Sequence, residues 1–527
     1  MIKDLRSAVV SSLRHQGIVF EEDSQELLLS QLKCSEQSEF ILFDDLVSDP
    51  QTCFWSEGFQ MLSAWQGTFA KPYNLARCPD NGPCYRITSD DGFCTCYSHI
   101  ILKISPEHFV LIGFTSCNKG QGAFRVYPDG RLVMYIDYWG TKLTDNVPGE
   151  SFCILEGTGI YQLRSKYARL LASRENSLLT EVVTPQSGWC SWYWYYADVT
   201  AEDIQENAAN LDDFPDFNWV LIDDGYQNHM GDWLIYSRKF PRGLNDLAAE
   251  IKRQGRKVAL WVSPFIVSSD SELFKNHQDW LAVNAEGKPL NAGDVTYGGW
   301  RDGDWYLLDF SVPEVQKYIH DVFSFFYNDL GIEFFKLDAL YWGCIKGSHY
   351  RSGITPVENY RLGLNVIRNA TEGKAFILGC NAPLLPSVGL VHGMRLADDV
   401  VRDRERMVAN IDLLLYRLWM QEQLFLLDPD CLCLKNNNSA LDEQVFDYHC
   451  KSFQVLNGVL MLGDRLSEYS RKDKEVISAI AGCARERLQV SDQSDDFRRV
   501  DLISGKNGNI RRYEFDPDTL TVNVTEL

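Results

Sequence analysis

Short apolar runs alternate with amphipathic stretches between residues 188 and 463, and this alternation constrains the possible folds more than any other feature. The runs lack the strict polar–apolar alternation of a strand with one wet face, which is typical of parallel strands that are covered on both faces. Eight such runs with helical connections over about 275 residues predict a (β/α)8 barrel, or TIM barrel. The runs are GWCSWY, WVLIDD, KVALWV, FFKLDAL, FILGC, GMRLAD, LFLLDPD and VLMLGD.

Helix-end signals lie between the runs. Ser311 and Glu314 have the spacing of a capping box, with Pro313 in the first turn of the predicted helix. Thr355 and Glu358 repeat this spacing before another helical stretch. The alternative is a doubly wound open sheet, but no G-x-G-x-x-G fingerprint follows a predicted strand. The barrel is therefore the favoured architecture.

The regions on either side have other patterns, which predict three parts. Residues 1–184 are mostly strand-like, with one helical stretch at 162–180, and predict an N-terminal β-sandwich-like domain. The clearest strand-like runs there are Ile100–Ile104, Phe109–Phe114 and Arg131–Tyr138. Residues 185–465 form the predicted barrel. Residues 466–527 predict a helix at about 472–485 and a small C-terminal β-domain, so the fold class is α/β with β-rich attachments.

The charge balance excludes several partners. Lys plus Arg number 51 against 73 Asp plus Glu, which gives a net charge of −22. Nucleic acids and anionic membranes require basic surfaces, so we expect neither as a partner. No apolar stretch approaches the roughly 20 residues of a membrane span, and the first residues lack the apolar core of a secretory signal. We expect a cytoplasmic protein with buried thiols; if it is exported, disulfides among the cysteines before Gly157 are the alternative.

Carboxylates stand at the carboxyl ends of several predicted strands. Because active sites of (β/α)8 barrels lie at that end, these groups are expected to converge on one pocket. No serine-hydrolase, zinc-protease, P-loop or EF-hand motif is present. Two carboxylates from different strands without metal ligands point to glycoside hydrolysis. The strand-end residues are Asp223, Asp224, Asp338, Asp398, Asp399, Asp428 and Asp430.

Two of these carboxylates have a basic residue on the same side of the strand. Lys336 precedes Asp338 by two residues, so it is expected beside Asp338 and would favour the ionised form that a nucleophile needs; a structural pair that plugs the barrel is the alternative. Arg395 precedes Asp399 by four residues, but a nearby cation would hinder a general acid. We therefore expect Arg395 on the substrate, with a solvated acidic loop as the alternative for Asp399.

Other residues at the strand ends suit a sugar pocket. Asp223 and Asp224 can accept hydrogen bonds from neighbouring hydroxyls, although anchoring of a loop is the alternative. Trp192 and Trp261 can stack on a sugar ring, and Cys380 is expected in the pocket wall. His349 stands alone in a predicted loop and is expected at the surface.

At these residues the sequence resembles glycoside hydrolase family 36, the α-galactosidases and their relatives. The resemblance runs from about residue 188 to 464 and rests on the segments LIDDGYQNHMGDW, WVSPF, FFKLDALYWG, ILGCNAPLLPSVGLVHGMRLADD and DPDCL. It implies that Asp338 is the nucleophile and Asp399 the acid/base. It also implies these sugar-contacting residues: Asp223, Asp224, Trp261, Lys336, Cys380, Arg395, Trp192 and Tyr193.

The chain departs from the family in two places. Members often carry an N-G-W-Q-S-W-S segment that reaches over the pocket, and the nearest match here is residues 57–63, with Phe59 and Leu62 at the tryptophan positions. The acid/base strand usually ends R-I-G-P-D, and here Asp398 replaces the proline. Substrate preference is therefore expected to differ from that for plain α-galactosides.

The resemblance implies a retaining exo-α-galactosidase that acts on a small galactoside or oligosaccharide and needs no cofactor or metal. One alternative uses the same site to transfer galactose to another sugar, as raffinose and stachyose synthases do. A second is a different terminal sugar such as α-N-acetylgalactosamine. A third is a sugar-binding protein without activity, which is disfavoured because both carboxylates are present. The oligomeric state stays open.

Overall fold

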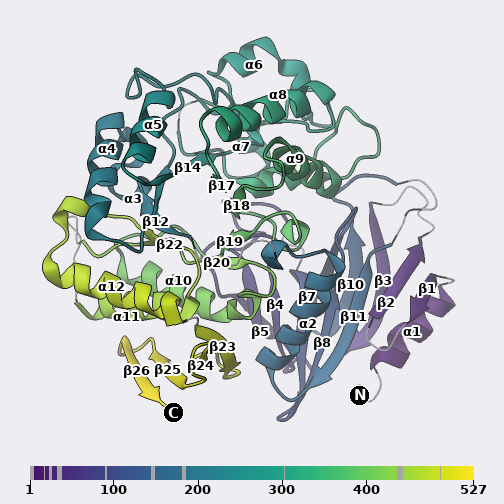
Figure 1. Cartoon of the computed structure of the whole chain (residues 1–527). Coiled ribbons are helices and arrows are strands. Elements are labelled where there is room, and N and C mark those ends of the chain that lie inside the picture. The colour runs from purple at the N-terminus through teal and green to yellow at the C-terminus, as the bar shows by residue number, and fades with distance from the viewer. Residues whose placement is uncertain are drawn as a thin grey trace.

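The structure is a computed structural model that describes most of the chain. The described residues are 5–16, 18–22, 26–32, 38–88, 92–143, 147, 149–180, 186–301, 303–435, 443–486 and 488–527. The predicted boundary at residues 184 and 185 lies between described segments. A ring of short strands with outer helices forms the centre of the molecule, and β-sheets lie beside it (Figure 1).

The central sheet consists of short parallel strands in chain order. Each of the eight apolar runs contains one strand of it. The strands are β12 (Ser187–Cys190), β13 (Trp219–Ile222), β14 (Lys257–Val262), β17 (Phe334–Leu337), β18 (Phe376–Gly379), β19 (Gly393–Arg395), β20 (Leu426–Asp428) and β22 (Leu460–Leu462). The last strand pairs with the first, Met461 opposite Gly188. Val459 donates a backbone hydrogen bond to Leu427 at 2.8 Å, which links β22 to β20, and β21 (Cys431–Leu432) pairs with β22. This curled sheet fits the predicted barrel.

Helices cover the outside of the sheet. They are α4 (Ala201–Asn210), α5 (Asn245–Arg253), α8 (Pro313–Ser324), α9 (Pro356–Ala370), α10 (Arg404–Tyr416) and α11 (Glu443–Leu456), with short helices α3 (Trp192–Tyr195), α6 (Glu272–Asn276) and α7 (Ala292–Val295) in the loops. The long β14–β17 connection also holds the hairpin β15 (Ile266–Ser268) and β16 (Trp305–Leu307). β18 and β19 are joined through a single 3₁₀ turn, Leu385–Ser387.

One of the two predicted capping boxes is confirmed. The Thr355 hydroxyl accepts from the Glu358 backbone, and the Glu358 carboxylate accepts from the Thr355 backbone, so α9 begins as predicted. The prediction for α8 is wrong, because its N-cap is Val312 and no side chain caps it. Pro313 is the first residue of that helix and has no N–H to satisfy. The Ser311 hydroxyl instead accepts from the Arg351 backbone.

The N-terminal region is built from antiparallel strands that meet at β7. The strands are β1 (Val19–Glu22), β2 (Glu26–Gln31), β3 (Glu39–Val47), β4 (Cys53–Glu57), β5 (Ala64–Thr68), β6 (Lys71–Asn74), β7 (Cys94–Ser105), β8 (His108–Phe114), β9 (Gln121–Val126), β10 (Arg131–Asp137) and β11 (Ser151–Gly157). β7 pairs with β4 and β8 and also with β9, so one branch is β1-β2-β11-β8-β7-β4-β5-β6 and the other is β7-β9-β10-β3. The three clearest strand-like runs lie in β7, β8 and β10, whereas α1 (Leu5–His15) was not predicted.

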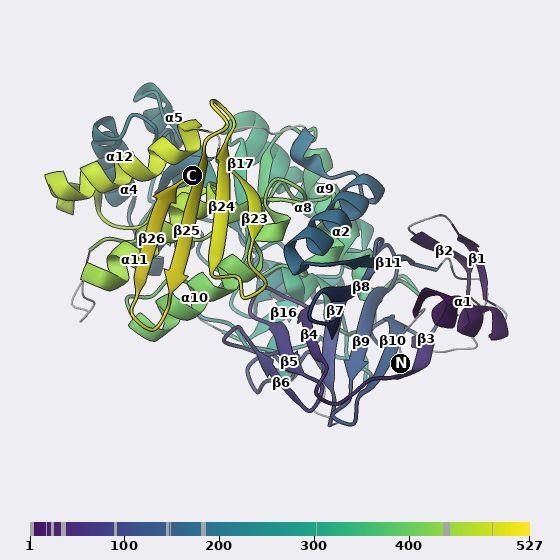
Figure 2. The ribbon, with the colours of Figure 1, turned by 90° about the horizontal axis from the view of Figure 1, so that it is seen from below.

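Helix α2 (Ile160–Arg174) contacts both β-rich regions. It packs on β8 and β11 of the N-terminal region, and Tyr161 donates to the Val490 carbonyl of the C-terminal sheet at 3.0 Å (Figure 2). The C-terminal part begins with α12 (Arg471–Glu486) close to the predicted bounds. Its antiparallel sheet holds three predicted strands and one unpredicted strand, β23. The strands are β23 (Leu488–Gln493), β24 (Arg499–Ser504), β25 (Ile510–Asp516) and β26 (Thr521–Glu526).

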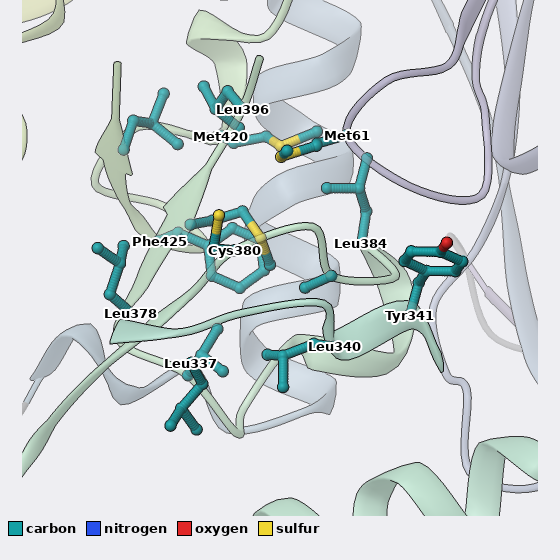
Figure 3. Packing of buried hydrophobic residues seen from close by; sticks show 14 of the residues in the cluster. Met61, Leu337, Leu340, Tyr341, Leu378, Cys380, Leu384, Leu396, Met420 and Phe425 are labelled. Carbon is teal, nitrogen blue, oxygen red and sulfur yellow. The ribbon is translucent and has the colours of Figure 1, made fainter. Parts of the chain in front are cut away.

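The N-terminal region also packs against the apolar core of the barrel. Figure 3 shows Met61 beside Met420 and near Leu384, in the same buried cluster as Leu337 and Leu378 of the neighbouring strands β17 and β18. Arg417, at the end of α10, fastens this segment. Its fully buried guanidinium donates to the Glu57 carboxylate at 2.9 Å and to the carbonyls of Met61, Ser63 and Leu396 at 2.6–2.7 Å. Residues 57–63 are therefore held against the end of strand β19. Among the described residues, none of the helices is both long and apolar enough to cross a bilayer.

Candidate active site

A cavity of about 260 Å³ opens at the carboxyl ends of the barrel strands. Eight of the ten predicted site residues line it. They are Asp223, Asp224, Trp261, Lys336, Asp338, Cys380, Asp399 and Trp192. Arg395 and Tyr193 lie behind the wall, with 0% of the Arg395 side chain and 2% of Tyr193 exposed. The expectation that strand-end carboxylates converge on one pocket therefore agrees with the structure.

Asp338 is held at the end of β17 with both carboxylate oxygens bonded. Trp261 donates its indole N–H to one oxygen at 3.1 Å, and the Ala339 backbone donates to the other at 2.6 Å. Ala339 has φ +52°, a left-handed conformation that non-glycine residues adopt infrequently. This turn directs the chain away from the strand directly after Asp338. The partly exposed carboxylate is thereby fixed toward the cavity.

Lys336 differs from its expected position, because its hydrogen-bonded partner is Asp223 and not Asp338. The ammonium lies 2.8 Å from the Asp223 carboxylate, and both side chains are almost fully buried. The two-residue alternation that predicted a Lys336–Asp338 pair fails beyond the strand, which ends at Leu337. Burial alone would lower the pKa of Lys336, but the negative charge of Asp223 outweighs it and keeps the pKa well above the usual value. Lys336 is thus a buried cation in the floor of the cavity.

Asp224 is bound by a segment that the sequence analysis did not single out. Arg301 donates to one of its oxygens at 2.6 Å, and Trp300 donates to the other at 2.9 Å. Gln227 adds a third hydrogen bond at 2.7 Å. Burial raises the pKa of Asp224, although the Arg301 charge opposes this shift. Asp224 therefore anchors the loop around residue 300 over the cavity. Only the remaining lone pairs of its carboxylate can accept a hydrogen bond from a sugar hydroxyl.

Arg395 contacts Asp399, the proposed acid, although it was expected to face the substrate. One terminal nitrogen is 3.0 Å from Asp399 and 2.5 Å from Asp430. Tyr193 also donates its hydroxyl to Asp430. The prediction that Arg395 faces the substrate instead of Asp399 is not what the structure shows. The four-residue spacing brings the pair together because Asp399 follows the end of β19 at Arg395.

The surroundings of Asp399 favour its charged form. Burial raises the pKa, but the guanidinium of Arg395 and the ammonium of Lys336 outweigh it and hold the pKa of Asp399 below its ordinary value. Asp430 behaves in the opposite way: burial raises its pKa to about 7 despite the charge of Arg395. Arg395 therefore sits between two carboxylates of unequal acidity, one of which is 49% exposed and lines the cavity.

The N-terminal region supplies one side of the cavity. Met61 and Leu62 line it, whereas Phe59 is 2% exposed and packs between Tyr97 and Trp139. Of the two replaced tryptophan positions, only Leu62 therefore reaches the cavity, and it presents an aliphatic side chain. Further lining residues that the sequence analysis missed include Arg77, Tyr85, Tyr297, Tyr341, Asn381 and Arg406.

His349 is not at the surface as expected. Its side chain is 4% exposed and lies 3.2 Å from the buried carboxylate of Asp309, which also accepts from the Tyr350 backbone at 2.6 Å. This pair fastens a loop outside the cavity. In the described ranges no three His, Cys, Asp or Glu side chains are grouped so that they could hold a metal ion.

Comparisons with known proteins agree with this geometry. The family model for melibiase matches residues 149–350, which include Asp223, Asp224, Trp261 and Asp338. The chain is thus similar to the α-galactosidases of glycoside hydrolase family 36. Similar proteins include α-galactosidase AgaA of Geobacillus stearothermophilus, 28% identical over 199 residues, and α-galactosidase Mel36A of Lactobacillus acidophilus, 25% identical over 179 residues. These alignments cover 34% and 33% of this chain and 25% and 22% of the relatives, so the match spans a quarter or less of their lengths.

Solved structures of α-galactosidases share the fold over most of the chain. TtGalA of Thermus thermophilus, solved in complex with stachyose, is 25% identical, with a TM-score of 0.67 over 88% of this chain and 95% of its own. The family-36 AgaA of Geobacillus stearothermophilus is 14% identical, with a TM-score of 0.62 over 93% of this chain and 69% of its own. The fold of most of the chain is thus similar to that of these α-galactosidases.

Proposed function

We propose that this protein is a retaining exo-α-galactosidase that releases terminal α-galactosyl residues from small galactosides. The observation that carries the proposal is that Asp338 and Asp399 line one cavity. Two hydrogen-bond donors fix Asp338, whereas Asp399 keeps about half of its side-chain surface exposed. A pair of carboxylates in one pocket is the minimum that glycoside hydrolysis requires.

In the first step an oxygen of Asp338 forms a bond to the anomeric carbon while the bond to the leaving oxygen breaks. Asp399 gives its proton to that oxygen, so the leaving group departs as an alcohol. In the second step Asp399, now a carboxylate, takes a proton from water. The water oxygen bonds to the anomeric carbon, and the Asp338 carboxylate leaves. Two displacements restore the α configuration in the released galactose.

The remaining residues of the cavity have roles in binding. Asp223 and Lys336 form a buried pair whose exposed atoms can accept from and donate to sugar hydroxyls. Trp192 offers aromatic surface for a sugar ring, and Cys380 is part of the wall. Trp261 is 1% exposed and acts through its indole N–H on Asp338. Arg395 and Tyr193 act from behind the wall, since they bind Asp399 and Asp430 and do not line the cavity.

The test is the stereochemistry of the first product. Hydrolysis of an aryl α-galactoside is followed by NMR before mutarotation, and α-galactose must appear first. Retention corresponds to carboxyl groups about 5–5.5 Å apart, so that water cannot fit between Asp338 and the sugar. Initial β-galactose would mean an inverting mechanism and would overturn the proposed role of Asp338. An absence of turnover would favour a sugar-binding protein.

Two other activities use the same residues and are separated by substrate choice. Transfer to a sugar acceptor would appear as a new oligosaccharide when sucrose is added to an aryl α-galactoside. Specificity for an amino sugar is suggested by one relative, the A type blood α-D-galactosamine galactosaminidase of Flavonifractor plautii, 30% identical over 108 residues. Aryl substrates with a 2-hydroxyl, 2-amino or 2-acetamido group would rank these possibilities directly.

We also propose a cytoplasmic location. The support comes from the thiols: most cysteine side chains of the described residues are buried. Buried thiols of this kind are stable in a reducing compartment. Fractionation of the native cells with thiol labelling of the unfolded chain would test both points.

A further inference from the structure

Two arginines hold one carboxylate at the mouth of the cavity. Arg77, which follows β6 in the N-terminal region, donates to Asp398 at 2.7 Å. Arg406, in the first turn of the barrel helix α10, donates to the same oxygen. All three side chains line the cavity. The cluster is therefore part of the substrate pocket and joins the two regions that form its rim.

The position of this cluster places it beside the departing group. Asp398 directly precedes Asp399, so the two Cα atoms are about 3.8 Å apart. Asp399 is the residue that must lie next to the glycosidic oxygen in the proposed function. A substituent of the leaving group, a few ångströms beyond that oxygen, would reach the guanidinium groups of Arg77 and Arg406.

The charge of the cluster is unbalanced. Two guanidinium groups face the Asp398 carboxylate, so these three side chains together carry one positive charge in a protein whose net charge is −22. The neighbouring Asp399 carboxylate has its own cation, Arg395. The Asp398 side chain is only 12% exposed, but Arg77 is 49% and Arg406 is 31% exposed. The cations are therefore more accessible than the anion that they bind. Guanidinium groups recognise carboxylates and phosphates with paired hydrogen bonds.

We infer that Arg77 and Arg406 form a binding site for an anionic substituent of the leaving group, a carboxylate or a phosphate, so that this protein prefers acidic galactosides to neutral ones. Asp398 holds the two guanidinium groups in place and limits the charge they present when the site is empty. The inference rests on the proposed α-galactosidase activity. It extends that activity from the sugar that is released to the group from which it is released.

The experiment compares substrates that differ in charge and hardly in shape. Carboxyphenyl α-galactosides are paired with the matching carbamoylphenyl α-galactosides, each as the 3- and 4-isomers so that the reach of the substituent is varied. We expect kcat/KM to be about tenfold higher for the carboxylate of the better isomer, as for a partly exposed charge-assisted contact. This preference is expected to shrink in 0.5 M salt, because salt screens exposed charges.

Variants that should change the carboxylate-to-amide ratio of kcat/KM in opposite directions separate substrate recognition from a purely structural role of the cluster. Arg77→Gln and Arg406→Gln should each lower the carboxylate-to-amide ratio toward one. Asp398→Asn should raise that ratio above its value in the unmodified protein, because it removes the competing negative charge and keeps the shape. Arg253→Gln, at a 70% exposed arginine of α5, is the matched control and should leave the ratio unchanged.

Each outcome bears on the inference. A ratio near one for both isomers, or equal falls of the ratio in Arg77→Gln and Asp398→Asn, would show that the cluster only fastens the rim and would overturn the inference while the proposed activity stands. A lack of turnover of all four substrates would remove the proposed function, and the inference with it. A higher rate on the amides would assign the opposite preference.

Discussion

Arg395 donates a hydrogen bond to the carboxylate of Asp399 at 3.0 Å, so a fully buried cation contacts the group proposed to act as the acid. The same nitrogen contacts Asp430 at 2.5 Å. A general acid works only while it is protonated, and Arg395 holds the pKa of Asp399 below its ordinary value against the effect of burial. The structure thus connects the pH range of activity to a shared guanidinium.

The first prediction concerns this pH range. Because the pKa of Asp399 is lowered, kcat/KM for raffinose is expected to peak on the acid side of neutrality and to fall as the pH rises and Asp399 loses its proton. Asp430→Asn should hardly move the alkaline limb, because burial raises the pKa of Asp430 to about 7 and the residue is mostly uncharged at the acid pH where this limb lies. Arg395→Gln should move it to higher pH. The pH profiles of kcat/KM measure all three.

A substrate with an activated leaving group provides the control for these profiles. A dinitrophenyl α-galactoside needs little protonation on departure, so its alkaline limb should be weak and should hardly move in either variant. A raffinose limb that moves to lower pH in Arg395→Gln, or that moves as far in Asp430→Asn as in Arg395→Gln, would contradict the proposed effect of the Arg395 charge on Asp399.

The second prediction concerns the nucleophile. Asp338→Ala should lower kcat by more than roughly a thousandfold, because no other group is placed to attack the anomeric carbon. The fold should be retained, since the carboxylate is partly exposed in the cavity and contacts only Trp261 and the Ala339 backbone. Added azide should restore part of the activity and yield the β-galactosyl azide. A near-native rate in Asp338→Ala would exclude this residue as the nucleophile.

The third prediction separates Asp399 from its neighbour. Asp399→Ala should lose far more activity on raffinose than on an activated aryl α-galactoside, because only the former needs a proton on the leaving oxygen. Asp398→Asn should keep activity on raffinose, since its carboxylate is bound by Arg77 and Arg406. Rates on the two substrates give the answer, and the reverse pattern would make Asp398 the acid.

The strands and most of the cavity could be predicted because their signals are local. Apolar runs mark the barrel strands, and five of the seven predicted strand-end carboxylates line the cavity, whereas Asp428 and Asp430 are buried behind it. Contacts between distant segments had no such signal: Arg301 reaches Asp224 from a loop without periodicity, and Arg77 reaches Asp398 from another region. The predicted partner of Lys336 was wrong because strand alternation ends one residue before Asp338.

The fourth prediction concerns metals. The carboxylates of the cavity are bound by Lys336, Arg301, Arg395 and indole or backbone N–H groups. Each of these carboxylates therefore already has a cation or a hydrogen-bond donor of the protein as its partner. Prolonged treatment with EDTA should therefore leave kcat unchanged. A large loss that a divalent ion reverses would show that one of these carboxylates binds metal during turnover.

The fifth prediction concerns Arg417, which fastens residues 57–63 to the barrel. Its buried guanidinium donates to one oxygen of the Glu57 carboxylate and to the carbonyls of Met61, Ser63 and Leu396. Arg417→Met would leave the Glu57 charge buried without a partner and should lower the free energy of unfolding by about 3–5 kcal/mol. Denaturant unfolding measures this loss. The double variant Glu57→Gln with Arg417→Met should recover part of it, because the unpaired charge is removed.

Function provides a second measure of the same contact. Met61 and Leu62 line the cavity only while residues 57–63 are fastened. Arg417→Met should therefore raise KM for raffinose. The kcat for an activated aryl α-galactoside should fall by a smaller factor, because turnover of that substrate depends less on the rim of the cavity. Arg417→Lys keeps one charge near Glu57 but cannot reach all the carbonyls. Its free energy of unfolding and its KM for raffinose should therefore lie between those of Arg417→Met and of the unmodified protein. If Arg417→Met were as stable as the unmodified protein, the ion pair with Glu57 would contribute nothing to holding the two regions together.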